Sequence, residues 1–210
     1  MKKLFEIEKI NGVNRTSGKV ILIALFIMLF SGFMPSGWSG PDEVQAVNYS
    51  SGGSGNWNVA GTWRTGACGS VVAGAVPGAG DSVEICATHT VTLVAASPIT
   101  NVIINPTGIL AGAGFLLTAS GNYTNNGTHS GTGGVTLSGA AMTIDGTGSV
   151  TNTGTFTISG TKTIAATANL SFSGAVTVTA AVTNSGTISV AGTLTVNGVT
   201  FTNNGTVTIT

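Results

Sequence analysis

The feature that most constrains the fold is a long series of very short segments in which apolar and polar residues alternate. Examples are GGVTLSG, AMTIDG, GTFTISG, NLSFSG, AVTVTA, GTISVAG and GTLTVNG, which follow one another between residues 133 and 198. Alternation with a period of two is typical of β-strands, and most of these segments end at a Gly or Asn after about four or five residues. Strands this short are atypical of a β-sandwich, and no stretch has the period of a helix. The sequence therefore predicts an all-β chain.

A right-handed parallel β-helix, or β-solenoid, accommodates such strands economically. Because one coil cannot bury its apolar face alone, successive coils stack and share a continuous core. We expect solenoid repeats over residues 100–210, with the intervening Thr side chains facing solvent on strands that suit their β-branched shape. The residues expected to face inward are Val135, Leu137, Met142, Ile144, Val150, Phe156, Ile158, Ile164, Leu170, Phe172, Val176, Val178, Val182, Ile188, Val190, Leu194, Val196, Val199, Phe201, Val207 and Ile209.

A recurring N-[N/T/S]-G-T motif predicts corners of the coils. It begins at Asn125, Asn152, Asn184 and Asn203, with spacings of 27, 32 and 19 residues. Asn and Gly tolerate left-handed backbone, and stacked Asn side chains can hydrogen-bond to one another. The sequence stops within such a unit, VTFTNNGTVTIT, so we expect that it is truncated and that further coils follow.

Residues 1–46 are typical of a signal peptide for Sec export. A polar segment with five basic and two acidic side chains precedes the apolar run Val20–Phe33, and the small-x-small sequence Val44–Ala46 predicts cleavage before Val47. The alternative is a retained membrane anchor, but the uninterrupted apolar run is shorter than the ~18 residues that favour a spanning helix. We therefore expect an extracellular or cell-surface protein.

Residues 47–99 differ in composition from the repeats, and we expect them to form an N-terminal cap. They contain Trp57, Trp63, Cys68 and Cys86. In an oxidising compartment the cysteines are expected to form a disulfide; a metal site at Cys86 and His89 is the alternative, although two ligands do not make a zinc site. The tryptophans are interpreted as packing residues that cover the first coil, with a sugar-stacking platform as the alternative.

Charge is scarce, and this excludes several classes of function. Charged residues make up 7% of the chain, and beyond residue 46 they are Arg64, Lys162, Asp81, Glu84 and Asp145. Nucleic-acid binding needs many Lys or Arg side chains to neutralise phosphates, so no nucleic-acid partner is expected. The sequence predicts no cofactor and no metal.

Catalysis on polysaccharides would need paired carboxylates, or a basic residue beside an acidic metal cluster. The repeats offer Asp145, Lys162 and His129, and Asp145 in IDGTG is interpreted as a turn residue. Asp81 and Glu84 are three residues apart around one strand, so they are expected to face opposite sides. We therefore expect no enzymatic activity.

The order of segments in residues 52–210 is that of a known group. The opening SGNWNVAGTW is followed by VPGAGDSVEI, by TVTLV and by NNGT coils. This order resembles the N-terminal part of large secreted bacterial β-helical, adhesin-like surface proteins, and INPTGIL resembles a turn of haemagglutinin-type two-partner secretion domains, with Thr107 in place of an Asn. The resemblance implies a secreted stalk. The residues that carry it are Gly55, Trp57, Trp63, Pro77, Asp81, Val83, Ile85, Val91, Leu93 and Asn125–Thr128.

Three functional hypotheses follow from these patterns. The leading one is a structural or adhesin-like stalk, whose expected partners are surface glycans or matrix proteins, and secretion or anchoring machinery engaged through a missing C-terminal region. The first alternative is the non-catalytic portion of a β-helical polysaccharide-active enzyme. The second is a Thr-ladder ice-binding protein, indicated by the T-x-T of TKT, TVT and TIT, but the irregular 27, 32 and 19 spacing argues against it.

Overall fold

The computed structural model describes residues 45–210, which form one compact unit. The expected signal peptide lies almost entirely outside the described residues. Within 45–210 the chain is built from β-strands, and helical structure is limited to η1 (Ala60–Thr62), a single 3-10 turn. No helix in this part of the chain is long and apolar enough to cross a membrane. The all-β prediction is confirmed.

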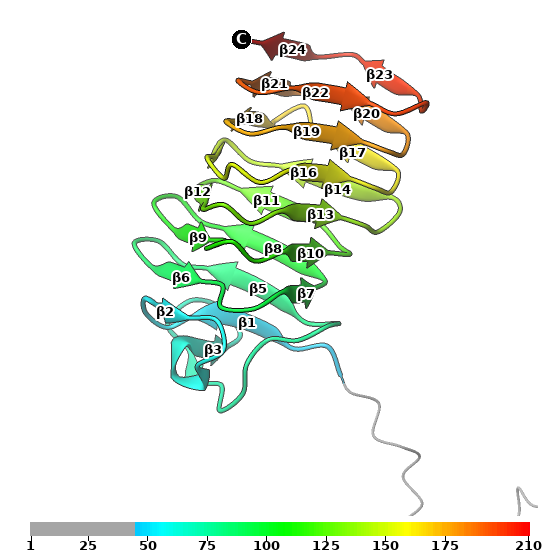
Figure 1. The fold of residues 1–210 in the computed structure, drawn as a ribbon. Coiled ribbons are helices and arrows are strands. Elements are labelled where there is room, and N and C mark those ends of the chain that lie inside the picture. Colours follow the sequence, from blue (N-terminus) through cyan, green and yellow to red (C-terminus); the bar gives the residue numbers. More distant parts are fainter. Residues whose placement is uncertain (1–44) are drawn as a thin grey trace, which may run out of the picture. The chain divides into compact units, whose positions relative to one another are not determined.

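Parallel sheets stack into a β-solenoid of about six turns (Figure 1). Each full coil contributes one strand to sheet A, one to sheet B and one to sheet C, in that order along the chain. The coil strands of sheet A are β1 (Asn48–Ser51), β5 (Ser82–Ile85), β8 (Asn101–Ile104), β11 (Tyr123–Asn125), β14 (Met142–Asp145), β17 (Lys162–Ile164), β20 (Val182–Asn184) and β23 (Phe201–Asn203). Those of sheet B are β2 (Gly55–Asn56), β6 (Thr90–Thr92), β9 (Ile109–Ala111), β12 (Thr128–Ser130), β15 (Ser149–Val150), β18 (Asn169–Phe172), β21 (Thr187–Val190) and β24 (Thr206–Ile209). Those of sheet C are β7 (Ser97–Ile99), β10 (Leu117–Ala119), β13 (Val135–Leu137), β16 (Phe156–Ile158), β19 (Val176–Val178) and β22 (Leu194–Val196).

Coil length varies, but strand pairing keeps the coils in register. From β5 onward, residues paired on successive strands are between 18 apart, as in Asn169 with Thr187, and 22 apart, as in Ser149 with Ser171. The first coil is longer, with Asn48 paired to Ser82, because it also contains β3 and β4. The extra residues lie in the loops between strands, which can lengthen without disturbing the parallel ladders. The solenoid repeat is therefore regular in space although it is irregular in sequence.

The Asn motif occupies two different corners. Asn125, Asn184 and Asn203 end strands of sheet A, at the turn into sheet B, whereas Asn152 follows β15 at the turn from sheet B into sheet C. The spacings of 27 and 32 residues thus run from one kind of corner to the other and back. These two spacings do not measure one coil, so their irregularity is no argument against a threonine ladder in register.

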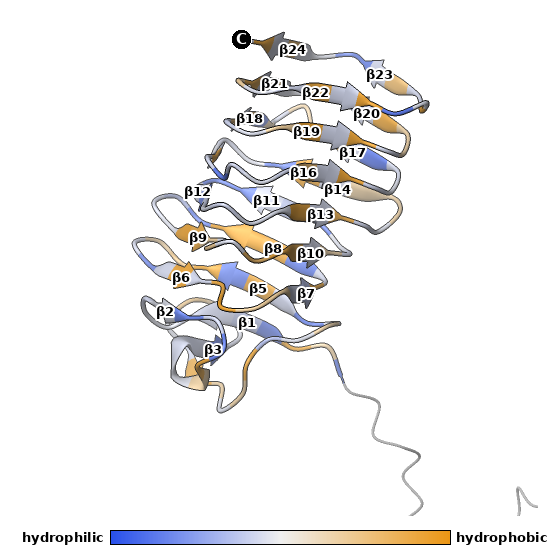
Figure 2. Cartoon of the chain, in the orientation of Figure 1, coloured by the Kyte–Doolittle hydropathy of each residue, from blue (hydrophilic) through white to orange (hydrophobic). Residues whose placement is uncertain are grey.

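Inward-facing residues form a continuous core, as the alternation predicts. Every residue expected to face inward from Val135 to Val190 is buried, and apolar residues recur on the strands of successive coils (Figure 2). The aromatic rings meet edge to face across coils, with the Phe156 centroid 5.6 Å from that of Tyr123 and 5.0 Å from that of Phe172. Such contacts add to the stabilisation that comes from area burial alone.

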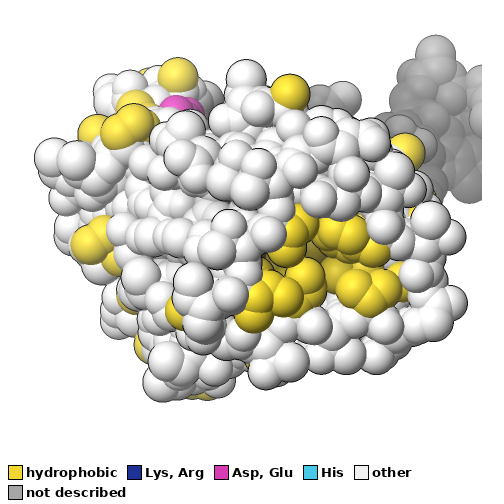
Figure 3. Space-filling model, turned by 90° about the horizontal axis from the view of Figure 1, so that it is seen from above, with side chains coloured by type: hydrophobic (Ala, Val, Ile, Leu, Met, Phe, Trp, Pro, Cys, Tyr) yellow, Lys and Arg dark blue, Asp and Glu magenta, His cyan; other side chains and the backbone are white. Residues whose placement is uncertain are grey.

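The last coil departs from the expected burial. Leu194, Val199, Phe201 and Val207 are only partly buried, because no later strand of the described residues covers the coil that contains them. Figure 3 looks onto this end and shows apolar side chains gathered on it. The two residues that depart furthest from the prediction are Val196, 40% exposed, and Ile209, 59% exposed.

The N-terminal end is covered differently. Strand β1 pairs in parallel with β5, and sheet A then continues through β3 (Trp63–Thr65) and β4 (Val71–Val72), which are antiparallel. Two antiparallel strands thus take the edge where another parallel coil would otherwise pair. Residues 82–99 were expected in the cap, but they form β5, β6 and β7 of the coils.

Trp57 and Trp63 are buried under the first coil. Trp63 is fully buried and Trp57 nearly so, and their ring centroids are 5.0 Å apart in an edge-to-face arrangement. The Trp63 Nε1 donates to the carbonyl of Trp57 at 2.7 Å. Rings in this position pack, and they cannot serve as an exposed sugar-stacking platform.

A disulfide joins Cys68 to Cys86, with 5.9 Å between their Cα atoms. It ties the loop that follows β3 to the end of β5. The Cys86 sulfur is therefore not a metal ligand, and His89 instead places its Nδ1 2.9 Å from the hydroxyl of Ser51. Among residues 45–210 no cluster of three or more His, Cys, Asp or Glu side chains could hold a metal.

Candidate functional site

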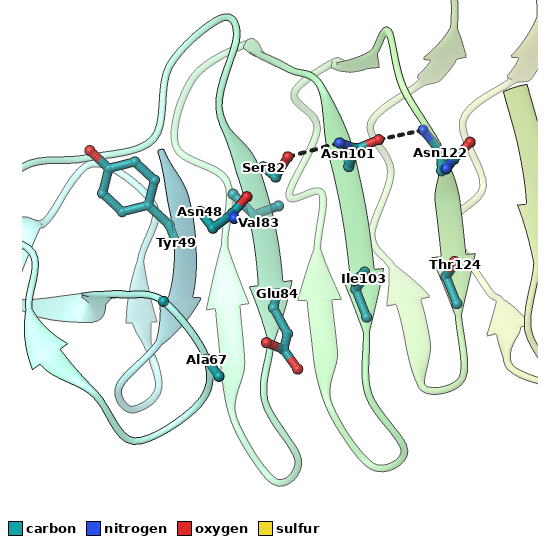
Figure 4. A pocket seen from close by; sticks show the side chains of 11 residues that line it. Asn48, Tyr49, Ala67, Ser82, Val83, Glu84, Asn101, Ile103, Asn122 and Thr124 are labelled. Carbon is teal, nitrogen blue, oxygen red and sulfur yellow. Dashed lines mark hydrogen bonds between the residues drawn. The ribbon is translucent and has the colours of Figure 1, made fainter. Parts of the chain in front are cut away.

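A groove of about 460 Å³ lies on the outer face of sheet A, beside the cap (Figure 4). Its floor is formed by the outward-facing residues of β1, β5, β8 and β11, and the loop at Gly66 and Ala67 forms one wall. This volume is within the usual range for a small-molecule site. Only Glu84 was considered as a candidate site residue from the sequence, because the groove is assembled from the strands of several coils.

One row of polar side chains crosses the groove from strand to strand. Asn48, Ser82 and Asn101 are paired in register, and Asn122 continues the row. The Asn101 side chain donates to the hydroxyl of Ser82 at 2.8 Å and accepts the backbone N–H of Asn122 at 2.7 Å (Figure 4). These bonds orient the Asn101 amide before any ligand arrives.

A second row, two residues further along the strands, is formed by Glu84, Ile103 and Thr124. The Glu84 carboxylate accepts a hydrogen bond from the Asn105 amide at 2.7 Å, and the same amide nitrogen is 3.7 Å from the Sγ of Cys68. Ile103 is 40% exposed. The second row therefore offers a positioned carboxylate, an apolar patch and a hydroxyl.

The wall of the groove is held by covalent and hydrogen bonds. Gly66 donates its backbone N–H to the carbonyl of Asn48 at 2.8 Å. Two residues later the disulfide of Cys68 ties the same loop to Cys86. Both bonds anchor the loop to coil strands and so fix the position of this wall.

The chemistry of the groove suits a neutral, hydroxyl-rich ligand. A carboxamide donates and accepts hydrogen bonds and an ionised carboxylate accepts them, so both can pair with sugar hydroxyls. An exposed aliphatic side chain can contact the apolar face of a sugar ring. The lining holds one carboxylate, Glu84, and no Lys or Arg. An anionic ligand would therefore meet like charge with nothing to offset it.

The three acids of residues 45–210 have different hydrogen-bond partners. Asp81 accepts backbone N–H groups of Val47 and Gly78, at 2.8 and 2.9 Å, and so closes a turn. Asp145 accepts the N–H of Gly146 at 2.7 Å and the hydroxyl of Thr167 at 2.8 Å. On sheet A, Glu84 and Asp145 are separated by the strands of Ile103 and Thr124.

Three strand spacings amount to about 14 Å. Paired carboxylates of glycoside hydrolases are closer than roughly 10 Å. The register therefore places Asp145 too far from Glu84 to form such a pair with it.

His129 and Tyr123 form a buried polar pair that the sequence did not reveal. Both are fully buried, and the Tyr123 hydroxyl is 3.0 Å from the His129 Nδ1. Burial lowers the pKa of His129 to about 4 and raises the pKa of Tyr123. The alternation of the sequence could have revealed that Tyr123 is buried, because Tyr123 occupies the inward position that Val102 occupies one coil earlier.

Lys162 is also buried, at 1% exposure, between Met142 and Val182 of the neighbouring strands. Its ammonium donates to the carbonyl of Gly139, and burial lowers its pKa. Neither His129 nor Lys162 is accessible to a polymeric substrate.

The corner asparagines act on the backbone. The Asn125 amide nitrogen donates to the carbonyl of Ser149 in the next coil at 2.9 Å, and its oxygen accepts the N–H of Gly127 at 3.1 Å. Asn184 repeats this arrangement with Thr206 and Gly186. Asn203 is exposed and accepts from Asn184 at 2.8 Å, and Asn152 donates to the carbonyl of Gly133.

Comparison with protein-family models, with curated proteins and with solved structures found no match. The functional argument therefore rests on the fold and on the groove.

Proposed function

We propose that this chain is a secreted or cell-surface, adhesin-like β-solenoid that binds neutral saccharides in the sheet A groove without catalysing a reaction. The stacked coils form the stalk. The observation that carries the proposal is the groove itself, in which Glu84 and the Asn101 amide are held in place by neighbouring coils. The disulfide agrees with an oxidising, extracellular location.

Saccharides fit the groove better than matrix proteins do. A stable protein interface usually has an aromatic or apolar centre surrounded by polar residues. The groove instead has amides and hydroxyls around the exposed side chain of Ile103, and a volume suited to a small ligand. Binding to a short segment of a surface glycan is the activity that this arrangement supports.

Saturation-transfer NMR on the full chain tests the proposal, with chitotriose, cellotriose and maltotriose as probes. At least one neutral trisaccharide is expected to bind, and sialyllactose is expected not to bind because it carries a negative charge. Glu84→Ala and Ile103→Ala should each weaken binding by about tenfold, which corresponds to the loss of one good contact.

Asp145→Asn is the matched control, since Asp145 lies on the same sheet but outside the groove. It should leave saccharide binding unchanged. Binding that survives Glu84→Ala and Ile103→Ala, or the absence of binding for all three neutral probes, would contradict the proposal.

A further inference from the structure

The outer face of sheet C carries a regular lattice of small hydroxyl side chains. Strand pairing aligns the central residues of five successive strands. Every one of them is a threonine. They are Thr118, Thr136, Thr157, Thr177 and Thr195.

A second row lies two residues beyond the first, at the position directly after each strand ends. Its members are Ser120, Ser138, Ser159, Thr179 and Asn197. Each donates its backbone N–H to a carbonyl of the preceding coil at 2.8 to 2.9 Å, as Ser138 does to Ala119, so the second row is in register too. The hydroxyls of Ser120, Ser138, Ser159 and Thr179 lie 3.3 to 3.4 Å from those same carbonyls, which shows that their side chains share one orientation.

The two rows define a repeat in two directions. Neighbouring strands are about 4.8 Å apart, and residues two apart on one strand are about 6.7 Å apart. The residue between the two rows in each coil, such as Leu137, Ile158 or Val178, is buried in the core. This burial prevents any strand from shifting its register relative to its neighbours. The lattice is therefore held rigidly by the same stacking that stabilises the fold.

The chemistry of this face is uniform. Neither row contains a charged or an aromatic residue. Polysaccharide binding would use aromatic rings or carboxylates, and anionic surfaces would need Lys or Arg. What remains is an array of methyl and hydroxyl groups, with the Asn197 amide at one end, that repeats from coil to coil at about 4.8 Å. Such a repeat offers regularly spaced hydrogen-bonding groups to a layer of water.

We propose that the outer face of sheet C binds ice, through ordered water held between these two polar rows. The function is independent of the saccharide groove, which lies on a different sheet. The other faces are less regular: the corresponding rows of sheet A contain Glu84, Ile103 and Asp145, and those of sheet B contain Ile109 and Ala111.

Ice recrystallisation inhibition and thermal hysteresis, measured on the full chain, test the inference. The wild-type chain is expected to inhibit recrystallisation. Thr157→Tyr places a large ring above the middle of the lattice and should raise the concentration needed for inhibition by about tenfold. Thr136→Lys, which adds a charge in the adjacent coil, should have a similar effect.

Thr163→Tyr is the matched control, because Thr163 is the central, outward residue of β17 on sheet A. It should leave inhibition unchanged. Thermal unfolding of each variant distinguishes a change of the sheet C surface from a loss of folding. Ice recrystallisation inhibition is compared only among variants whose unfolding midpoint equals that of the wild type.

Three results would overturn the inference. The first is that the wild-type chain has no effect on ice. The second is that Thr163→Tyr weakens inhibition as much as Thr157→Tyr does. The third is that sedimentation detects a dimer, with sheet C covered by a second copy, which Thr157→Tyr dissociates. Because none of these outcomes involves a saccharide, failure here leaves the groove proposal untouched.

Discussion

The hydroxyl of Tyr123 and the Nδ1 of His129 lie 3.0 Å apart inside the solenoid, on strands of two different sheets. The surrounding core consists of aliphatic and aromatic side chains, so the two residues hydrogen-bond to each other. The Nε2 of His129 has no hydrogen-bond partner. The pair therefore makes the stability of the core depend on pH.

The first prediction concerns acid stability. In the unfolded chain His129 takes up a proton near its usual pKa of about 6.5, whereas burial lowers the pKa to about 4 in the folded chain. Protonation thus favours unfolding, so the stabilisation is complete above the unfolded pKa and falls by up to about 3 kcal/mol as the pH drops to the folded pKa. Urea unfolding between pH 7 and pH 4 measures this loss.

The double variant Tyr123→Phe/His129→Leu is the comparison for that measurement. It removes both polar groups together and leaves an apolar core, so its free energy of unfolding should change less over the same pH range. An identical pH dependence in both proteins would show that His129 is not the group responsible.

The second prediction concerns Lys162. Met142 occupies the equivalent inward position one coil earlier, so Lys162→Met should pack in the same way. Because burial lowers the pKa of the lysine, its charged form is disfavoured in the folded chain. The variant should therefore be more stable at pH 7 by about 1 kcal/mol.

Chemical denaturation at pH 7 and above pH 10 checks this expectation. The wild-type chain should gain stability as the pH rises through the lowered pKa, so the advantage of Lys162→Met should shrink at the higher pH. A variant less stable than wild type at pH 7 would mean that the bond to the Gly139 carbonyl outweighs desolvation.

The third prediction concerns the corner asparagines. Asn125→Ala leaves the partly buried carbonyl of Ser149 and the N–H of Gly127 without their partner, and should cost about 2 kcal/mol in the free energy of unfolding. The control is Asn204→Ala, an exposed corner position that should change stability by less than about 0.5 kcal/mol. Equal effects at the two sites would show that the buried hydrogen bonds contribute nothing specific.

The fourth prediction concerns the disulfide. Cys68→Ser/Cys86→Ser opens a loop with a sequence separation of 18 residues, and the variant should lose about 3 kcal/mol of stability. Guanidinium unfolding measures the loss. Since the disulfide also holds the wall of the groove, saccharide binding should weaken, while ice recrystallisation inhibition by folded protein should persist.

Local features of the fold were predictable from the sequence. Alternation in segments such as VTL and FTI is enough to assign strands and inward residues, because side chains on a strand point alternately to its two faces. The spacing of Cys68 and Cys86 together with the expected export was enough to predict the disulfide. Each of these signals lies within a short stretch of chain.

Relationships between coils were decided only by the tertiary structure. Loops of varying length separate the strands, so sequence spacing does not reveal which residues stack; Asn152 shares a motif with Asn125 but occupies another corner. The groove brings Asn48 and Asn122 together from distant coils, and the Thr rows of sheet C become visible only through strand pairing. The physical reason is that hydrogen bonds and core packing set the register between coils, whereas the sequence pattern alone specifies only which face of each strand turns inward.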